Sequence, residues 1–233
     1  MAPTINNPTE VSKAPSFNPS NSIPSKVPTY IPSSTPSLCD VWEQIGEIDG
    51  LNAGDNFGNA VSISSDGTIL AIGSNKYNTN NNAIGRVQVY IRSSDNQSWT
   101  TRGSPINGDN AGDKFGYSVS LSGDGNILAS SAKQYGENNE DLKGKVRIFS
   151  FNNSTANWNQ LGVDIIGEEN DESGSVVTLS SDGSVVAIGS PGNVHRAGVV
   201  RAYTFQNNSW TQQGNDIIGN LTMIVLDLAH FNL

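Results

Sequence analysis

Catalytic side chains are scarce in this sequence of 233 residues, which has one cysteine and two histidines. Because Cys39 is the only cysteine, an internal disulfide and a thiol-based metal site are excluded. Neither His195 nor His230 belongs to a Ser-His-Asp spacing, a phosphate loop or a His/Cys metal motif. We therefore expect the chain not to be an enzyme and to use no cofactor or metal. A glycosidase-like site of paired carboxylates is the remaining catalytic alternative.

Long apolar runs and positive charge are also scarce. No apolar run reaches the roughly 18 residues of a membrane-spanning helix, and the first residues lack the apolar core of a secretory signal. The formal net charge of −9 repels phosphate backbones. We expect no membrane span in this chain and no nucleic-acid partner.

Proline is confined almost entirely to one end, since eight of the ten prolines lie before residue 37. Six of these recur as Pro-Ser or Pro-Thr, nearly every fourth residue. Proline fixes the φ angle, and Ser and Thr add no apolar area, so this stretch cannot bury a core. The sequence predicts a disordered Pro/Ser/Thr-rich stalk over residues 1–38, which is either a plain linker or O-glycosylated.

From residue 42 onward the sequence repeats itself. The segment AGDNFGNAVSISSDGTILAIGS (53–74) matches AGDKFGYSVSLSGDGNILASSA (111–132), and a degenerate copy follows at 169–191. The four tryptophans return at intervals of 57, 59 and 52 residues, each with a glycine four residues later. They are Trp42, Trp99, Trp158 and Trp210. Self-similarity at a fixed period is the signature of a repeat architecture.

Within each unit the apolar residues alternate with a period of two, as in Val61 and Ile63. An Asp-Gly pair follows each such strand, which we interpret as a two-residue hairpin turn in which both residues adopt positive φ. A third strand (85–90 in the first unit) and the Trp-led fourth strand complete the unit. Four antiparallel strands in about 55 residues is the size of one propeller blade.

We therefore predict an all-β fold, a partial β-propeller of about three four-stranded antiparallel blades behind the disordered stalk. The repeat domain covers 39–219, and 220–233 is an irregular tail. Its units are 42–98, 99–157 and 158–209, and another begins at 210. The lone first strand (42–48) is typical of a ring-closing latch whose partner strands are absent. We hypothesise that the chain is truncated relative to a larger ring, which further blades or another chain would complete.

The repeated residues have structural interpretations. Each Phe-Gly pair is predicted to wedge between blades, because the ring offers buried area and the glycine allows close backbone approach. Each Asp before it can accept backbone N–H groups in its turn, and each Trp is predicted to pack rather than bind. These structural residues are Asp55, Phe57, Gly58, Asp113, Phe115, Gly116, Trp42, Trp99, Trp158 and Trp210. In the third unit Ser173 replaces the phenylalanine, so we expect that blade to be locally looser.

These motifs resemble the FG-GAP repeat family, whose short variant reads Gly-Asp-x-Phe-Gly-x-x-Val, then Ser-x-Asp-Gly, then Gly-Ala-Pro. The last position reads Gly73-Ser74-Asn75 in the first unit, and the second unit departs from it with Ser131-Ala132-Lys133. The resemblance implies a β-propeller like the heads of integrin α chains, an extracellular or cell-surface location, and adhesion or ligand binding. Calcium does not carry over, because one carboxylate in a short turn cannot supply six to eight oxygens.

The variable loop between the second and third strands differs most among the units. In a propeller it shares a rim with the connection into each first strand, and binding residues tend to lie on such loops. The candidate binding residues are Tyr77, Asn78, Tyr135, Glu137, Asp141, His195 and Arg196. The predicted function is a non-catalytic extracellular binding or adhesion module with a protein or glycan ligand. The alternatives are a structural surface-coat repeat protein without a specific ligand and, third, a glycosidase-like enzyme.

Overall fold

The computed structural model describes residue 44 and residues 46–79, 82–95, 98–136, 142–192 and 197–219. The predicted stalk, Trp42 and the tail lie outside the described residues. The chain divides into two units, Met1–Glu43 and Gln44–Leu233, and the blades belong to the second unit. Its described residues include no helix long and apolar enough to cross a membrane.

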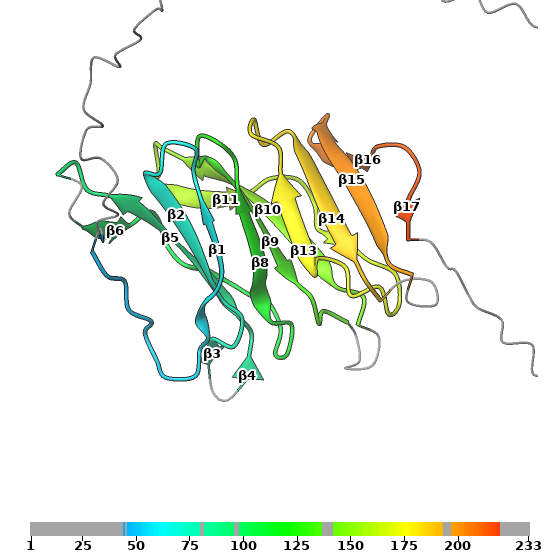
Figure 1. Cartoon of the computed structure of the whole chain (residues 1–233), viewed down its shortest axis with the longest axis horizontal. Coiled ribbons are helices and arrows are strands. Elements are labelled where there is room, and N and C mark those ends of the chain that lie inside the picture. The colour runs from blue at the N-terminus through cyan, green and yellow to red at the C-terminus, as the bar shows by residue number, and fades with distance from the viewer. Residues whose placement is uncertain are drawn as a thin grey trace, which may run out of the picture. The chain divides into compact units, whose positions relative to one another are not determined.

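Three antiparallel sheets follow one another along the chain and form the blades (Figure 1). Blade 1 contains β1 (Phe57–Ile63), β2 (Ile69–Ser74), β5 (Arg86–Arg92), β6 (Trp99–Thr101) and β7 (Ile106–Asn107). Blade 2 contains β8 (Phe115–Leu121), β9 (Ile127–Ala132), β10 (Lys145–Asn152), β11 (Asn157–Gln160) and β12 (Ile165–Ile166). Blade 3 contains β13 (Val176–Leu179), β14 (Val185–Ser190), β15 (Val199–Gln206), β16 (Ser209–Gln212) and β17 (Ile217–Ile218). The short strands β3 (Asn78–Thr79) and β4 (Asn82–Ala83) pair within a loop. The predicted all-β fold of three blades is confirmed.

The outer strand of each blade is interrupted, so each sheet has a short fifth strand. In blade 1, β6 and β7 pair with opposite ends of β5. Gly103 lies between them with φ of 77°, a left-handed conformation that favours glycine. A Cβ at Gly103 would also lie 3.1 Å from the indole of Trp158. Glycine is therefore required for both the bend and the contact, which explains the glycine four residues after Trp99.

The turn between the first two strands differs from the sequence prediction. Ser64 donates its backbone N–H to Ile69 (2.9 Å), and Gly67 donates to Ser64 (2.9 Å), so four residues form the loop. Only Gly67 has positive φ (69°). The carboxylate of Asp66 accepts hydrogen bonds from the Ser64 hydroxyl (2.6 Å) and the Thr68 N–H (3.0 Å). The predicted two-residue turn with positive φ at both residues is wrong, because the aspartate stabilises a type I-like turn from within.

The blades stack face to face, and we call the face toward the next blade along the chain the forward face. Val87 and Val89 of blade 1 project forward and are buried with Phe115 and Val119 of blade 2 in one core cluster. A second cluster lies between blades 2 and 3. The inner strands β1, β8 and β13 lie side by side (Figure 1). Strand alternation thus supplies each blade with two apolar faces.

Serine hydroxyls link the inner strands of neighbouring blades. The Leu121 N–H donates to the Ser62 hydroxyl (2.9 Å), and the Leu179 N–H donates to the Ser120 hydroxyl (2.9 Å). Both serines alternate with the apolar residues of their own strands. The forward face of each inner strand therefore carries hydroxyl groups that accept hydrogen bonds from backbone N–H groups of the next blade.

Blade 3 has different contacts at the position where Ser173 replaces the phenylalanine. Ser173 is buried and donates its N–H to the Lys143 carbonyl (3.0 Å). Arg201 pairs with the buried Asp171 (2.6 Å) and with Asp216 (3.0 Å) beside it. The first strand of blade 3 has four residues, compared with seven in β8, and an ion-pair network lies where blade 2 has an aromatic pair.

Candidate functional site

Blade 2 packs on blade 1 through close backbone contacts, and we call the surface of blade 1 that receives them the seat. Phe115 and Gly116, which we call the wedge of blade 2, lie against glycines of blade 1. Phe115 is 1% exposed, and its N–H donates to the Ile84 carbonyl (3.1 Å). A Cβ at Gly85 would lie 2.0 Å from the Phe115 carbonyl oxygen, and one at Gly73 would lie 2.2 Å from that of Gly116. Backbone packs directly on backbone here, which only glycine permits.

The same positions recur on blade 3, where they line an open pocket of about 400 Å³. Val200 has the ladder position of Val87, because each pairs with a glycine of the second strand and an isoleucine of the last. The matching pairs are Gly73 and Gly189, Gly85 and Gly198, Val87 and Val200, Ile106 and Ile217, and Gly108 and Gly219. We call the blade 3 set (Gly189, Gly198, Val200, Ile217 and Gly219) the socket.

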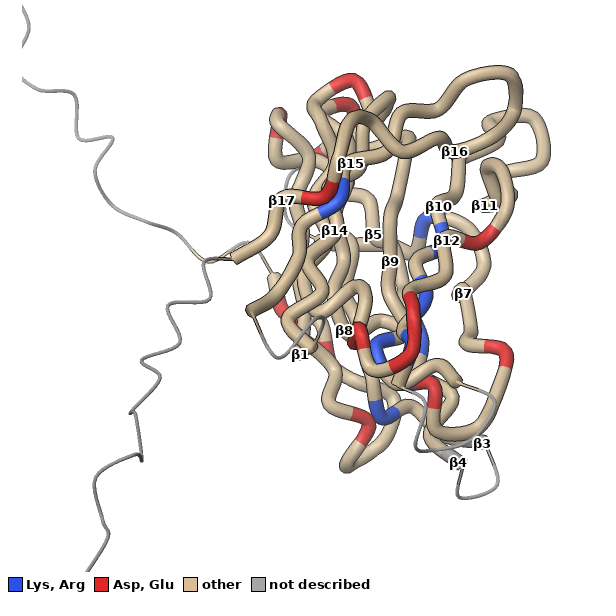
Figure 2. Tube along the Cα trace, turned by 90° about the vertical axis from the view of Figure 1, so that its right-hand side faces the viewer, with Lys and Arg blue, Asp and Glu red and all other residues tan. Residues whose placement is uncertain are grey.

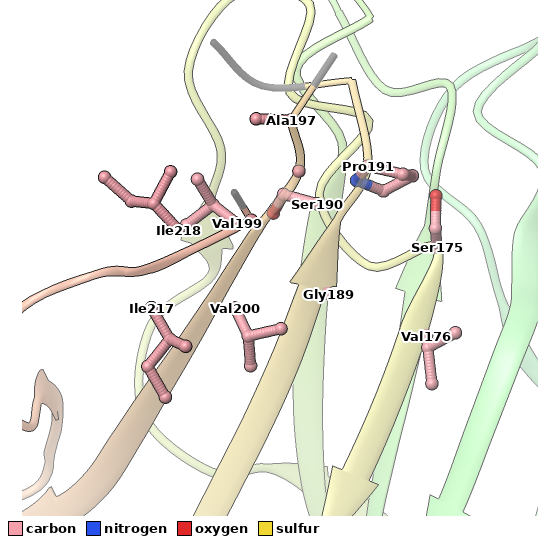
Figure 3. Close-up of a pocket in the computed structure, with 12 residues that line it drawn as sticks. Ser175, Val176, Gly189, Ser190, Pro191, Ala197, Val199, Val200, Ile217 and Ile218 are labelled. Atoms are coloured by element: carbon pink, nitrogen blue, oxygen red, sulfur yellow. The ribbon is translucent and has the colours of Figure 1, made fainter. Parts of the chain in front are cut away.

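The socket side chains are exposed where their counterparts are buried. Val200 is 42% exposed and Val87 is fully buried, at 0%. Ile217 is 67% exposed, whereas Ile106 is 9% exposed. Figure 3 shows Ile217, Val200 and Val176 one beside another, from β17, β15 and β13. An apolar surface of this kind at the end of a stack marks an interaction site.

Blade 1 carries the complementary open face. Val61 is 62% exposed, although its counterpart Val119 is 7% exposed between the blades. Ile63 is exposed as well, and Phe57 is half-buried. Phe57 and Gly58 thus form a wedge at one end of the stack, and the socket lies at the other end. Among the described blades, the wedge face of blade 1 and the socket face of blade 3 each have no other blade stacked on them.

Charged groups gather at the rim where the blade connections meet the variable loops. In blade 2, Lys145 pairs with Asp109 (2.8 Å) and Asp164 (3.6 Å) and is almost completely buried. Burial raises the pKa of Asp113 above its ordinary value, and the charge of Lys145 opposes that rise. Figure 2 shows acidic positions spread over the loops and basic positions near β10 and β15. The buried Lys145 of the blade 2 rim is therefore paired with carboxylates of its own surroundings.

Blade 1 differs at this rim because Leu51 takes the place of Asp109. A small pocket of about 100 Å³ lies there, lined by Asp55, Tyr77, Arg86 and Tyr90 among others. Arg86 lies over the Tyr77 ring (3.6 Å to its centroid) and donates to its hydroxyl (2.7 Å). Burial raises the pKa of Tyr90, and the charge of Arg86 opposes that rise.

The structure places three of the predicted binding residues. Tyr77 packs on Arg86, and Tyr135 packs on Lys145, whose Nζ lies 4.2 Å from the ring centroid. Asn78 is in β3, paired with Ala83. Four others, Glu137, Asp141, His195 and Arg196, lie outside the described residues. Each loop does meet the connection of its own blade, since Lys76 donates its N–H to the Asp55 carbonyl (3.2 Å).

The structural residues have defined surroundings. Trp158 and Trp210 are buried and contact Phe151 and Phe205 with ring centroids 5.2 and 5.1 Å apart. The Asp113 carboxylate accepts from the backbone and side-chain nitrogens of Asn110 (3.3 and 3.2 Å). Within the described ranges no three His, Cys, Asp or Glu side chains lie close enough to hold a metal ion.

Sequence reasoning missed the socket, although a signal was present. The period of two assigns Val200 and Ile217 to the forward face of the third unit, where no further wedge follows in the described chain. Attention to the variable loops directed the prediction to the rim instead. The glycines of the socket stand out in the sequence as repeat markers, but their role as a backbone seat requires the stacked geometry.

Comparison with known proteins gives similarity in solved structures only. No family model matches the chain, and no curated protein matches it. A candidate 6-phosphogluconolactonase from Bacteroides fragilis is 14% identical, with a TM-score of 0.47, over 69% of this chain and 38% of that one. Sqt1 of Saccharomyces cerevisiae is 16% identical, with a TM-score of 0.42, over 68% and 35%. The periplasmic gluconolactonase PpgL of Pseudomonas aeruginosa is 11% identical, with a TM-score of 0.43, over 67% and 45%. The chain spans less than half the length of each.

Two expectations are corrected by these comparisons. The sequence led us to expect a non-catalytic adhesion module and not an enzyme, whereas the similar solved chains include proteins named as lactonases. Neither the adhesion function nor the absence of catalysis is retained, because one fold carries many functions, catalytic ones included. The likeness itself is one of fold.

Proposed function

We propose that this chain supplies three consecutive blades of an FG-GAP-type β-propeller, and that it functions by stacking its open faces on further blades. The observation that carries the proposal is the socket on blade 3. It repeats, position by position, the seat that holds Phe115 and Gly116 on blade 1. The Phe-Gly motifs of the first two units support assignment to this family.

The energetics favour an occupied socket. Burying a side chain of the size of valine or isoleucine contributes about 1.5–3 kcal/mol. Val176, Val200 and Ile217 are all exposed on this one face. In the two internal stacks the positions of Val200 and Ile217 are buried. A further blade would therefore remove a continuous apolar surface from water.

The test adds a blade in cis. Residues after Gly219 are replaced by a second copy of residues 109–167, which carries its own wedge. We expect slower hydrogen exchange at residues 198–200 and 217–219 and a higher Tm than in the natural chain at a concentration where that chain is monomeric. The matched control is the same extended chain with Val200→Asp, which should lose both effects. Equal exchange in the extended chain and in the monomeric natural chain would overturn the proposal.

A second candidate function is favoured by the blade 1 pocket. Arg86 forms no ion pair with any residue in the described ranges, whereas Lys145, at the same position of blade 2, pairs with Asp109. Its hydrogen-bond partners are the neutral Tyr77 and Asn107. We propose that this guanidinium binds a small anion, such as the phosphate group of a phosphorylated sugar lactone. A candidate 6-phosphogluconolactonase is among the similar solved chains.

The hydrolysis of 6-phosphogluconolactone, measured by the release of acid, tests this second candidate. The natural chain should accelerate hydrolysis over buffer, and Arg86→Gln should abolish the acceleration. Lys76→Gln, a neighbouring exposed cation, is the control that should leave the rate unchanged. A natural chain without any acceleration contradicts the candidate.

A further inference from the structure

We propose that the partner of the socket is a second copy of this chain, and that two copies close head to tail into a six-bladed ring. The inference rests on the proposed stacking function and names its partner. The wedge of one copy (Phe57–Gly58) would occupy the socket of the other, and the reverse contact would close the ring.

The free wedge already has the geometry of the seated one. Gly58 has φ of 86° and Gly116 has φ of 81°. The Phe57 ring meets Tyr90 edge to face at 6.4 Å, and the Phe115 ring meets Phe149 in the same way at 6.3 Å. The backbone of Gly58 and the ring packing of Phe57 therefore already match those of the seated pair, Phe115 and Gly116.

The socket is equally preformed. Gly198 has φ of 75°, compared with 78° for Gly85, whose backbone contacts the seated wedge. Among the described residues, a Cβ at Gly198 would meet only its own loop, at 3.6 Å from Pro191, and no counterpart of Phe115 lies there. A socket with this backbone conformation fits the wedge of the second copy, because that wedge is a Phe-Gly pair like the one seated on blade 1.

Polar groups match across the two open faces as well. Between blades 1 and 2 the hydroxyl of Ser62 accepts the N–H of Leu121, and Ser120 does the same for Leu179. The next residue in this series is Thr178 on the open face of blade 3, which keeps the hydroxyl. Its donor in the second copy would be the N–H of Ile63, the counterpart of Leu121.

The number of copies follows from closure. Propellers close with four to eight blades, so the three described blades cannot close alone, two such sets give six, and three sets exceed the range. A head-to-tail contact that closes forms a ring, whereas one that does not close forms an open filament. A pair of copies is therefore the smallest assembly that buries every open face.

One segment must move on closure. Gly50 and Gly219 hold the same repeat position, and a Cβ at Gly50 would lie 2.8 Å from the Cβ of Phe57. In the ring, Gly219 of the second copy takes this place. Residues 46–50 form no strand, whereas Ile217 and Ile218 pair with β15, so we expect 46–50 to be displaced.

The experiment measures the mass of the full chain in solution, with complementary variants. The natural chain should have twice the monomer mass of 24.7 kDa, independent of concentration above the dissociation constant. Val200→Asp/Ile217→Asp blocks the socket, and Val61→Asp/Ile63→Asp blocks the wedge face. Each variant alone should be monomeric, with at least a tenfold weaker association. Their mixture should form a one-to-one pair, because one intact wedge meets one intact socket.

Two further measurements keep the outcome decisive. All four substituted residues are exposed in the single chain, so circular dichroism should show an unchanged fold. Gly198→Ala should also block pairing, because its Cβ would occupy the wedge space. A natural chain that stays monomeric overturns the second-copy inference. If the extended chain with a fourth blade still fills its socket, the proposed stacking function survives that result. If the wedge-face variant still forms a dimer, the two copies must contact each other through their sockets, and that result would also overturn the second-copy inference.

Discussion

The indole nitrogen of Trp158 donates a hydrogen bond of 2.9 Å to the backbone carbonyl of Arg102. This bond links the outer strand of blade 2 to the end of the outer strand of blade 1. Trp210 repeats it one blade later, donating to the carbonyl of Leu161 at 2.8 Å. The blades are thus connected at their outer edge as well as through the inner-strand serines and the apolar cores.

Replacement of Trp158 by phenylalanine tests the outer connection. Loss of the indole N–H leaves the Arg102 carbonyl without this donor, so we expect a decrease of about 1 kcal/mol in the free energy of unfolding. Trp210→Phe should have an effect of similar size, because its contacts are equivalent. Urea unfolding followed by circular dichroism measures both. Unequal effects would show that the two blade junctions are not alike.

Gly85 tests the backbone seat between blades 1 and 2. Gly85→Ala adds a Cβ that would lie 2.0 Å from the Phe115 carbonyl oxygen, at a φ of 78°. We expect a loss of at least about 2 kcal/mol, the sum of strain and a displaced blade. Gly54→Ala is the control, since its φ is also positive but no atom lies within 4 Å. Similar losses for both variants would mean that strain alone acts at Gly85.

The buried ion pair of blade 3 is predicted to be sensitive to loss of one partner. Asp171→Ala leaves the guanidinium of Arg201 without its closest carboxylate, at 2.6 Å. We expect a loss of about 3–5 kcal/mol in unfolding free energy, and recovery in the double variant Asp171→Ala/Arg201→Met. Glu168→Gln is the control, because that exposed carboxylate lies 4.0 Å from Arg201 and contributes about 0–1 kcal/mol. An Asp171→Ala variant with an unchanged free energy of unfolding would contradict the stabilising role of this ion pair.

The aspartates in the hairpin turns should make the stability of the fold depend on pH. Hydrogen bonds from Ser64 and Thr68 lower the pKa of Asp66 from 3.8 to about 2. Asp182 shows the same lowering to about 2 through Ser180 and Ser184. Because the folded-state pKa is lowered, the stabilisation is present above pH 3.8 and is lost as the pH falls through 2.

The measurement compares urea midpoints at pH 5 and at pH 2 for the natural chain and Asp66→Asn. The variant should be less stable at pH 5 and should lose less on acidification, because its side chain no longer titrates. Glu47→Gln, at an exposed position before the first strand, is the control. An acid response in Asp66→Asn as steep as in the natural chain contradicts the prediction.

The strands and their order were predictable from the sequence because the period of two is a local property. Val61 and Ile63 alternate with serines, and the alternation alone assigns them to one apolar face. The identity of the wedge was also accessible, since a phenylalanine next to glycine recurs in the first two units. The interrupted outer strand was not predicted, because Gly103 acts there through its contact with Trp158 in another blade.

The site was predictable only in part. That the variable loops and the blade connections share a rim follows from topology, and Lys76 and Asp55 do meet there. Which rim side chains remain available depends on pairing across blades, as between Lys145 and Asp109. The adhesion function was inferred from resemblance, and the absence of catalysis was inferred from the scarcity of catalytic side chains, and both expectations were corrected.

The seat made by Gly73 and Gly85 is composed of main chain, and its contacts with the next blade need only that these two positions carry no side chain. Duplicating or deleting one whole unit in the gene would therefore preserve both mating surfaces. Lineages could change the size of the assembly in steps of a single unit while every surviving junction stays intact. Side-chain-based junctions would need coordinated substitutions at each such step.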